Sequence, residues 1–228
     1  MEKQAFFDVD YTLYDGYLTT NFNHFLVHSG YAHDCPSEPV GKLEAEFAAG
    51  TIGYEEASKR VTALTANLLR DQKVSTVQAW QDAFATEHTY IYPWVASVFE
   101  LLKSRGFEIT LISAAVQPAL ESIAKALNAS AWHSTQLEIV DGVYSGRALE
   151  LLNYQAKHTL LKTLINNNAF SLGMGDSSGD IDMLGGVTYP ILYNPKTPEL
   201  RQLAETKQWP IATGETVFEM IKGKIESL

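Results

Sequence analysis

The stretch Phe6–Gly16, FFDVDYTLYDG, decides the fold prediction because an apolar strand ends there in two carboxylates. Alternate residues of an extended chain share a face, so Asp8 and Asp10 point the same way, with Thr12 next in the series. At about 4 Å and an effective dielectric of about 20, two like charges repel by roughly 4 kcal/mol. We therefore expect this strand end to have a partner that compensates the repulsion.

The composition indicates a globular protein with a substantial core. The chain has 228 residues, of which 46% are hydrophobic, and its formal net charge is −10. This length allows one large domain, or a core domain that carries a smaller insertion. The acidic residues are scattered along the chain, and this balance argues against nucleic-acid and anionic membrane partners. An anionic substrate would need a local cation to bind against the overall charge.

Cysteine content and hydropathy favour a soluble protein of a reducing, cytoplasmic compartment. The single cysteine, Cys35, excludes an intrachain disulfide and a cysteine-based zinc site. The segment MEKQAFFDVD lacks the features of a signal peptide, and no apolar run is long enough to span a bilayer. The sequence leaves the oligomeric state open.

Apolar runs and helical patterns alternate along much of the chain. The expected strands are Gln4–Asp8, Phe107–Ser113, Phe170–Gly173, Pro190–Tyr193 and a weaker pattern near Trp209–Ala212. Helices bounded by proline or glycine are expected over Pro93–Arg105, over Pro118–Leu127 and from Pro198. This alternation predicts parallel crossovers and therefore an α/β core with a doubly wound, Rossmann-like parallel sheet. The dipeptide Asp141-Gly142 predicts a small antiparallel hairpin beside it.

The segment from about Tyr17 to His88 differs from the rest because it offers amphipathic helical patterns and no convincing core strand. We therefore expect a helical cap of residues 16–89, inserted into a core domain of residues 1–15 and 90–228. The insertion follows the first strand directly and lies close to the paired aspartates. This position suits a lid.

The expected core strands end in polar groups that can carry chemistry. The first ends in Asp8 and Asp10, the second in Ser113, and the third in Asp176, with Asp180 following in GDSSGD. Each motif alone is common in helix caps, turns and loops. In open α/β sheets, however, ligands bind at the carboxyl ends of the strands. The joint occurrence in this order indicates a single site.

Lys157, early in the helical pattern Tyr154–Ile165, completes a recognisable set. Together with DVDYT, LIS and GDSSGD, it resembles the motifs of the haloacid dehalogenase (HAD) superfamily of phosphohydrolases. The helical insertion after the first motif resembles the cap of the phosphoserine-phosphatase-like branch, subfamily IB. The resemblance extends over essentially the whole chain, down to YNPKTPELRQLA. Its motifs are specific for the superfamily and not for a substrate.

The resemblance implies an enzyme, a phosphomonoester hydrolase in which Asp8 is the nucleophile that forms an aspartyl-phosphate. Asp10 would protonate the leaving alcohol and then deprotonate the water that hydrolyses the intermediate. Thr12, Ser113 and Lys157 belong to the substrate-binding side of the site. There Thr12 would hold the loop, and the other two would bind the phosphoryl oxygens.

Magnesium is the cofactor that the resemblance implies, held in a shell of oxygen ligands. The side chains of Asp8 and Asp176 and the backbone carbonyl of Asp10 would bind it. Asp180 would support the ion directly or through water. The cation would compensate the clustered carboxylates, and together with Lys157 it would attract an anionic ester to an acidic protein.

Three positions bear on the substrate. Tyr11 stands where the family usually has a small residue. Tyr17 stands where phosphoserine phosphatases have a glutamate that binds the substrate ammonium, whereas Arg60 aligns with the arginine that binds the substrate carboxylate. Without the ammonium partner, phosphoserine is weakened as a candidate among small-molecule phosphate esters. Two alternatives stay open: a phosphotransferase that passes the phosphoryl group to an alcohol such as homoserine, and a non-catalytic phosphate-binding protein on the same fold.

Overall fold

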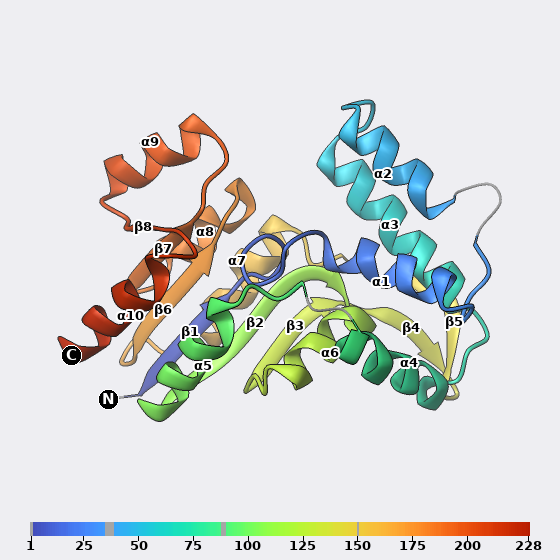
Figure 1. The fold of residues 1–228 in the computed structure, drawn as a ribbon, viewed down its shortest axis with the longest axis horizontal. Helices are drawn as coiled ribbons and strands as arrows, with labels where there is room; N and C mark the ends of the chain where they lie inside the picture. Colours follow the sequence, from blue (N-terminus) through green and yellow to red (C-terminus); the bar gives the residue numbers. More distant parts are fainter. Residues whose placement is uncertain (1, 35–38, 88–89, 150) are drawn as a thin grey trace.

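A six-stranded parallel sheet is the centre of the computed structural model, which describes residues 2–34, 39–87, 90–149 and 151–228 (Figure 1). Its strands are β1 (Lys3–Phe7), β2 (Phe107–Val116), β3 (Ala131–Thr135), β6 (Phe170–Gly175), β7 (Tyr189–Tyr193) and β8 (Ile211–Ala212). They lie in the order β3-β2-β1-β6-β7-β8, and each neighbouring pair is parallel. The predicted α/β class with a doubly wound sheet is confirmed. Cys35 lies outside the described residues.

Side-chain alternation along β1 supplies apolar groups to both faces of the sheet. Ala5 and Phe7 belong to a large apolar core, whereas Phe6 belongs to a second one. The first core is shared by α5 (Trp94–Ser104), α6 (Gln117–Ala126) and α10 (Val217–Glu226). The second is shared by α7 (Tyr154–Leu164), α8 (Ile181–Gly185) and α9 (Pro198–Lys207). Helices therefore cover both faces, and the carboxyl ends of the strands are left for a site.

The insertion between β1 and α5 is helical in its described part. It contains α1 (Leu18–His28), α2 (Val40–Ala48), α3 (Tyr54–Leu68) and α4 (Val74–Glu87). In Figure 1, α2 and α3 project from the rest of the molecule, whereas α4 lies beside α6. The side chain of Gln81 fixes α4 there, because its Nε2 donates to the Pro118 carbonyl at 2.8 Å. A helical cap is consistent with this arrangement, and its predicted limits at residues 16 and 89 stay a prediction.

A hairpin of β4 (Leu137–Val140) and β5 (Val143–Ala148) supports the far end of α3. Asp141 and Gly142 both have positive φ, 50° and 78°, as a two-residue type I′ turn requires. The backbone N–H of Asp71 donates to the Tyr144 carbonyl at 2.9 Å, which joins the hairpin to the chain after α3. The predicted antiparallel hairpin is confirmed. Among the described residues, no helix combines the length and the apolar character that a bilayer crossing needs.

Candidate active site

Asp8 directly follows β1 and continues its hydrogen bonding, since its N–H donates to the Met174 carbonyl at 3.0 Å. The alternation of β1 places it on the same side as Phe6, which is the side covered by α7 and α8. Asp8 is only 5% exposed, and Lys157 Nζ of α7 lies 2.5 Å from its Oδ1. The strand thus places the buried carboxylate of Asp8 beside the buried amine of Lys157.

Lys157 is held between two carboxylates. Its Nζ also lies 3.3 Å from Asp180 Oδ1. The helix that carries Lys157, α7, is capped by Asn153, whose side chain accepts the Ala156 N–H at 3.0 Å. Burial lowers the pKa of Lys157, but the nearby carboxylates of Asp8 and Asp180 outweigh this effect and raise it above the usual value. The amine is therefore positively charged at any physiological pH.

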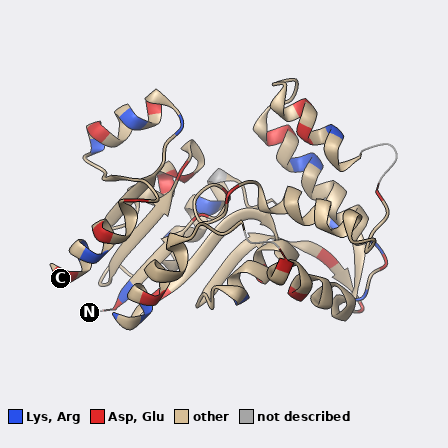
Figure 2. Cartoon of the chain, viewed as in Figure 1, with Lys and Arg blue, Asp and Glu red and all other residues tan. Residues whose placement is uncertain are grey.

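The positive charge at this site is local. Acidic and basic residues are interspersed on α2, α3 and α9, and no single basic face stands out among the elements drawn in Figure 2. The lysine at the strand ends is therefore a local positive charge in a chain whose net charge is −10.

The loop after β6 positions Asp180 through a capping box. Asp180 Oδ2 accepts the N–H and the hydroxyl of Ser177 at 3.1 and 2.7 Å, and Ser177 Oγ accepts the Gly179 N–H at 3.2 Å. A Cβ atom at Gly175 would lie 2.4 Å from Asp180 Cβ. Glycine at this position is thus what allows Asp180, which is fully buried, to pack against the end of β6.

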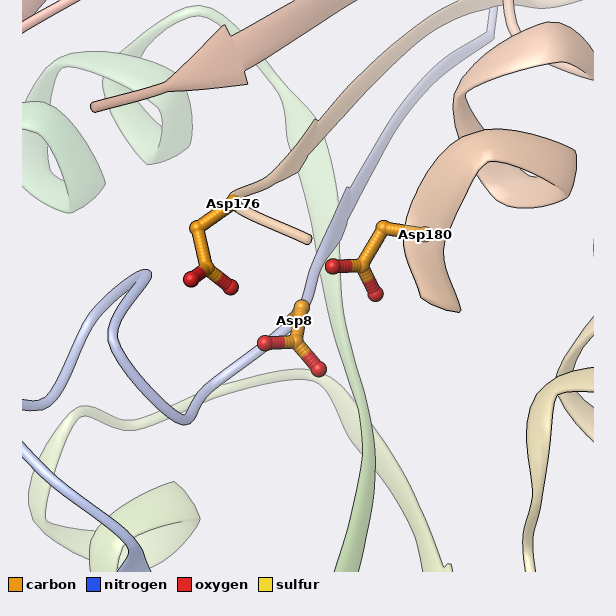
Figure 3. Close-up of side chains that lie close together, drawn as sticks. All are labelled: Asp8, Asp176 and Asp180. Carbon is orange, nitrogen blue, oxygen red and sulfur yellow. The ribbon is translucent and has the colours of Figure 1, made fainter. Parts of the chain in front are cut away.

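Asp8, Asp176 and Asp180 point toward one another (Figure 3). One carboxylate oxygen of each lies within 4.8 Å of the others. Burial raises the pKa of Asp176 to about 7, with Asp180 adding to the rise, and burial also raises the pKa of Asp8 well above its usual value. These shifts come first from burial and second from the neighbouring carboxylates, which repel one another. A cluster of carboxylate oxygens with this charge fits a hard divalent cation such as magnesium.

Asp10 connects the site to the cap. Its Oδ1 accepts the N–H of Leu18 at 2.9 Å, at the start of α1, where Tyr17 makes no side-chain cap. Burial raises the pKa of Asp10 to about 6, although the Leu18 hydrogen bond and Lys157 lower it. A carboxyl group with this pKa can exchange a proton near neutral pH, as a general acid and base must.

Thr12 and Ser113 are both fully buried but differ in their surroundings. Thr12 Oγ1 lies 3.3 Å from Asp8 Oδ2 and 3.3 Å from Asp176 Oδ1. Its hydroxyl group therefore contacts two of the converging carboxylates. Ser113 Oγ, in the last part of β2, accepts the Ala115 N–H at 3.1 Å. The phosphate-binding role of Ser113 stays a prediction, because the cavity over the strand ends is lined by Ala114 and not by Ser113.

A cavity of about 480 Å³ lies over the strand ends. Asp8, Asp10, Lys157 and Asp176 form part of its core side, whereas the α3 residues that line it are Tyr54, Glu55, Ser58 and Lys59. Tyr11 and Tyr17 line it between these two sides. The cavity thus brings the predicted catalytic residues together with a helix face that the sequence analysis did not single out.

Arg60 does not line this cavity. Its Nη1 lies 2.7 Å from Glu46 Oε2, so the guanidinium joins α3 to α2 within the cap. The preceding residue, Lys59, faces the cavity, and its Nζ lies 2.8 Å from Glu55 Oε1. The predicted contact of Arg60 with substrate stays a prediction that this position does not favour. In the sequence, Tyr54, Glu55, Ser58 and Lys59 stand at positions i, i+1, i+4 and i+5. This spacing was the available signal that they share one face of α3.

The family model of the haloacid dehalogenase-like hydrolases matches residues 5–185, which include the strand ends and the loop with Asp176 and Asp180. The chain belongs to this family. The predicted resemblance is confirmed for the HAD-like hydrolases, and the following relatives agree with it.

Two relatives of this HAD-like hydrolase come from Mycobacterium tuberculosis and are both named phosphoserine phosphatases. The first is 28% identical over 124 residues, which are 52% of this chain and 30% of the relative. The second is 27% identical over 218 residues, which are 91% of this chain and 69% of the relative. The matched part is therefore less than a third of the first relative. Family and relatives together support a phosphatase.

A solved structure from Bordetella pertussis Tohama I has the same fold as this HAD-like hydrolase. That structure is of a protein with unknown function. The TM-score is 0.76 at 24% identity, and the superposition covers 92% of this chain and 98% of the other. This likeness concerns the fold and says nothing of a substrate.

Proposed function

We propose that this hydrolase is a magnesium-dependent phosphomonoesterase, which transfers the phosphoryl group of a small ester first to Asp8 and then to water. The observation that carries the proposal is the surroundings of Asp8. On one side its carboxylate meets the buried Lys157 amine at 2.5 Å, and on the other it meets the carboxylates of Asp176 and Asp180. A nucleophile, a fixed cation and a set of oxygen ligands thus converge at one end of the cavity.

In the first step, a carboxylate oxygen of Asp8 attacks phosphorus while the bond between phosphorus and the ester oxygen breaks. The leaving alkoxide takes a proton from Asp10. Lys157 stabilises the negative charge on the phosphoryl oxygens without moving, because it is already fixed between Asp8 and Asp180.

In the second step, water attacks the phosphorus of the aspartyl-phosphate, and Asp10, now ionised, accepts its proton. The bond between Asp8 and phosphorus breaks, which releases phosphate and restores the carboxylate. Asp10 is suited to both steps because its pKa of about 6 is close to the working pH. A magnesium ion held by Asp8, Asp176 and Asp180 would supply the positive charge that offsets the carboxylates and the phosphoryl oxygens.

The partner in this proposal is a small-molecule phosphate ester. The cytoplasmic location and the absence of nucleic-acid and membrane partners stay predictions from the sequence. Transfer to an alcohol such as homoserine would use the same first step, with the acceptor hydroxyl in place of water. Release of inorganic phosphate, measured with and without candidate acceptors, separates hydrolysis from transfer.

The variant that tests the proposal is Asp8→Asn, assayed for phosphate release from small esters with magnesium. We expect turnover to fall roughly 10⁴-fold, because the amide is not a nucleophile and cannot form the acyl phosphate. Asp182→Asn is the matched control, since Asp182 is an exposed residue of α8 outside the cavity lining. Full activity in Asp8→Asn, or an equal loss in the control, would refute the proposed nucleophile.

A further inference from the structure

We infer that the site selects phosphate esters whose alcohol carries an uncharged, apolar group, and that this group lies beneath the cap. The inference rests on the proposed function and names the substrate class of the same site. It starts from a second cavity of about 70 Å³, which adjoins the catalytic one. The two cavities share Asp10, Tyr17, Tyr54, Ser58 and Ala114 in their linings. The second cavity therefore begins beside Asp10, where the leaving alcohol of the substrate is placed.

The second cavity is mostly apolar on its cap side. The residues that α2 and α3 add to its lining are Val40, Leu43, Phe47, Ala57, Val61 and Leu64, with Glu44 and Thr62 as the polar ones. A single water molecule needs roughly 10–15 Å³ of such space, so the cavity accommodates a short alkyl chain or a group of similar size. Each buried methylene group contributes about 0.8 kcal/mol, or about a fourfold gain in affinity.

Aromatic side chains continue from the active-site loop to the cap and fix the shape of this region. Tyr11 and Tyr17 meet edge to face with ring centroids 5.0 Å apart, and Tyr17 and Phe47 do so at 5.8 Å. Phe47 contacts Tyr54 in the same manner at 6.5 Å. Lys196 Nζ lies 3.3 Å from the centroid of the Tyr11 ring. The wall is therefore formed before substrate arrives, which lowers the cost of ordering it.

Tyr11 adopts a backbone conformation that bulky residues rarely take, with φ of 56°. The family position usually holds a small residue, so the tyrosine ring adds aromatic surface at the expense of backbone strain. Its contacts with Lys196 and Tyr17 stabilise this conformation. The strained residue lies in the loop between Asp10 and Thr12 and lines the catalytic cavity.

The charged side chains of the cap at these cavities are engaged with one another, which disfavours a zwitterionic alcohol. Lys59 pairs with Glu55 at 2.8 Å, and Glu44 pairs with His24 of α1 at 2.6 Å. Tyr17 adds no charge at the position where an ammonium partner was expected. The charged groups of phosphoserine would therefore have to displace existing pairs, whereas an apolar group has a cavity to enter.

The test is a series of ethyl, propyl and butyl phosphate, compared with phosphoserine in the presence of magnesium. The three alkyl alcohols have nearly the same acidity, so differences in kcat/KM report contacts of the alkyl group. We expect kcat/KM to rise about fourfold per methylene, and butyl phosphate to exceed phosphoserine at least tenfold. A flat series, or phosphoserine ahead of butyl phosphate, overturns the inference while hydrolysis itself supports the proposed function. If none of the three alkyl phosphates and no phosphoserine is hydrolysed, the proposed function fails, and the inference fails with it.

Two substitutions in α3 test whether the second cavity causes the predicted preference for longer alkyl groups. Ala57→Leu fills the second cavity, and we expect the ratio of kcat/KM for butyl over ethyl phosphate to fall from more than tenfold to nearly one. Ala63→Leu is the matched control, because Ala63 is an exposed residue of the same helix and lines neither cavity. Alanine and leucine have similar helix propensities, so both variants should fold. An unchanged ratio in Ala57→Leu, or an equal fall in the control, overturns the inference.

A cationic group is the main rival occupant, because aromatic rings also bind quaternary ammonium ions. Phosphocholine and its uncharged carbon isostere, in which tert-butyl replaces trimethylammonium, have the same shape and differ in charge. We expect the uncharged ester to have at least a tenfold higher kcat/KM. A higher kcat/KM for phosphocholine overturns the proposed apolar class.

Discussion

The strand ends of the core and the cavity-lining face of the cap position their side chains differently. Asp8 is 5% exposed and contacts both Lys157 and Thr12, whereas Tyr54 of α3 is 38% exposed. Lys59 of α3 forms an exposed pair with its own helix neighbour. Phosphoryl transfer depends on groups held in fixed geometry, and recognition of the alcohol depends on shape and polarity. Under the proposed function, the core carries out the reaction and the cap selects the ester.

The largest effect is expected where the core loses its buried cation. Lys157→Met keeps the length of the side chain but leaves the carboxylates of Asp8 and Asp180 without their partner. We expect the free energy of unfolding without magnesium to fall by about 3–5 kcal/mol and turnover to fall roughly 10³-fold. Urea unfolding and phosphate release measure these quantities.

Lys162→Met is the control for that experiment, since Lys162 is an exposed residue of the same helix, α7. Its free energy of unfolding and its turnover should equal those of the unaltered protein. If Lys157→Met were equally harmless, the core would not depend on a fixed cation, and the contrast with the cap would be lost.

Magnesium should stabilise the core in a pH-dependent manner. Burial raises the pKa of Asp176 to about 7 in the folded, metal-free protein, above its usual value of 3.8. The folded state therefore binds the extra proton, and metal-free stability should fall as the pH rises from about 4 to about 7. Magnesium binds the ionised carboxylates, so its stabilising effect should grow over the same range. At a concentration about 100 times Kd it amounts to ~2.7 kcal/mol.

Thermal unfolding with magnesium or with a chelator, repeated across this pH range, measures the effect. Asp176→Asn should lose most of the stabilisation by magnesium, and Asp182→Asn should retain it. A melting temperature that magnesium leaves unchanged at pH 8 would contradict the assignment of the carboxylate cluster as a metal site.

The smallest effect is expected for Arg60→Ala in the cap. Its guanidinium contacts Glu46 and does not line the cavity, so the KM for phosphoserine should change less than about threefold. The partly exposed pair should contribute about 1 kcal/mol or less to stability. A steep rise in KM would show that Arg60 reaches the substrate, and the cap would then recognise charge.

The core was predictable from sequence because its signals are local. The alternation of apolar residues in β1 and the carboxylates that follow it indicate both the strand and the site, and Asp141-Gly142 indicates the hairpin turn. The strand β3 was missed, because AWHST is short and has no clear alternation of apolar residues. Strand β2 also continues to Val116, beyond the predicted end at Ser113, where it pairs with β3.

The sequence predicted that the cap is helical, but it did not predict which residues of the cap face the cavity. Which side of α3 looks into the cavity depends on packing against α1 and against β5, contacts that are distant in sequence. The periodicity of a helix fixes which residues share a face but not the direction in which that face points. Arg60 was predicted from the family resemblance, whereas the structure places Lys59 at the cavity.

The most direct test of the account is to find the phosphoryl group on Asp8. Turnover of an ester that carries radiolabelled phosphate is quenched in acid within one reaction cycle, and the labelled peptide is identified by mass spectrometry. We expect label on the peptide that contains Asp8, present in the unaltered enzyme and absent in Asp8→Asn. Steady release of labelled phosphate with no label on the protein, or label on another residue, would contradict it.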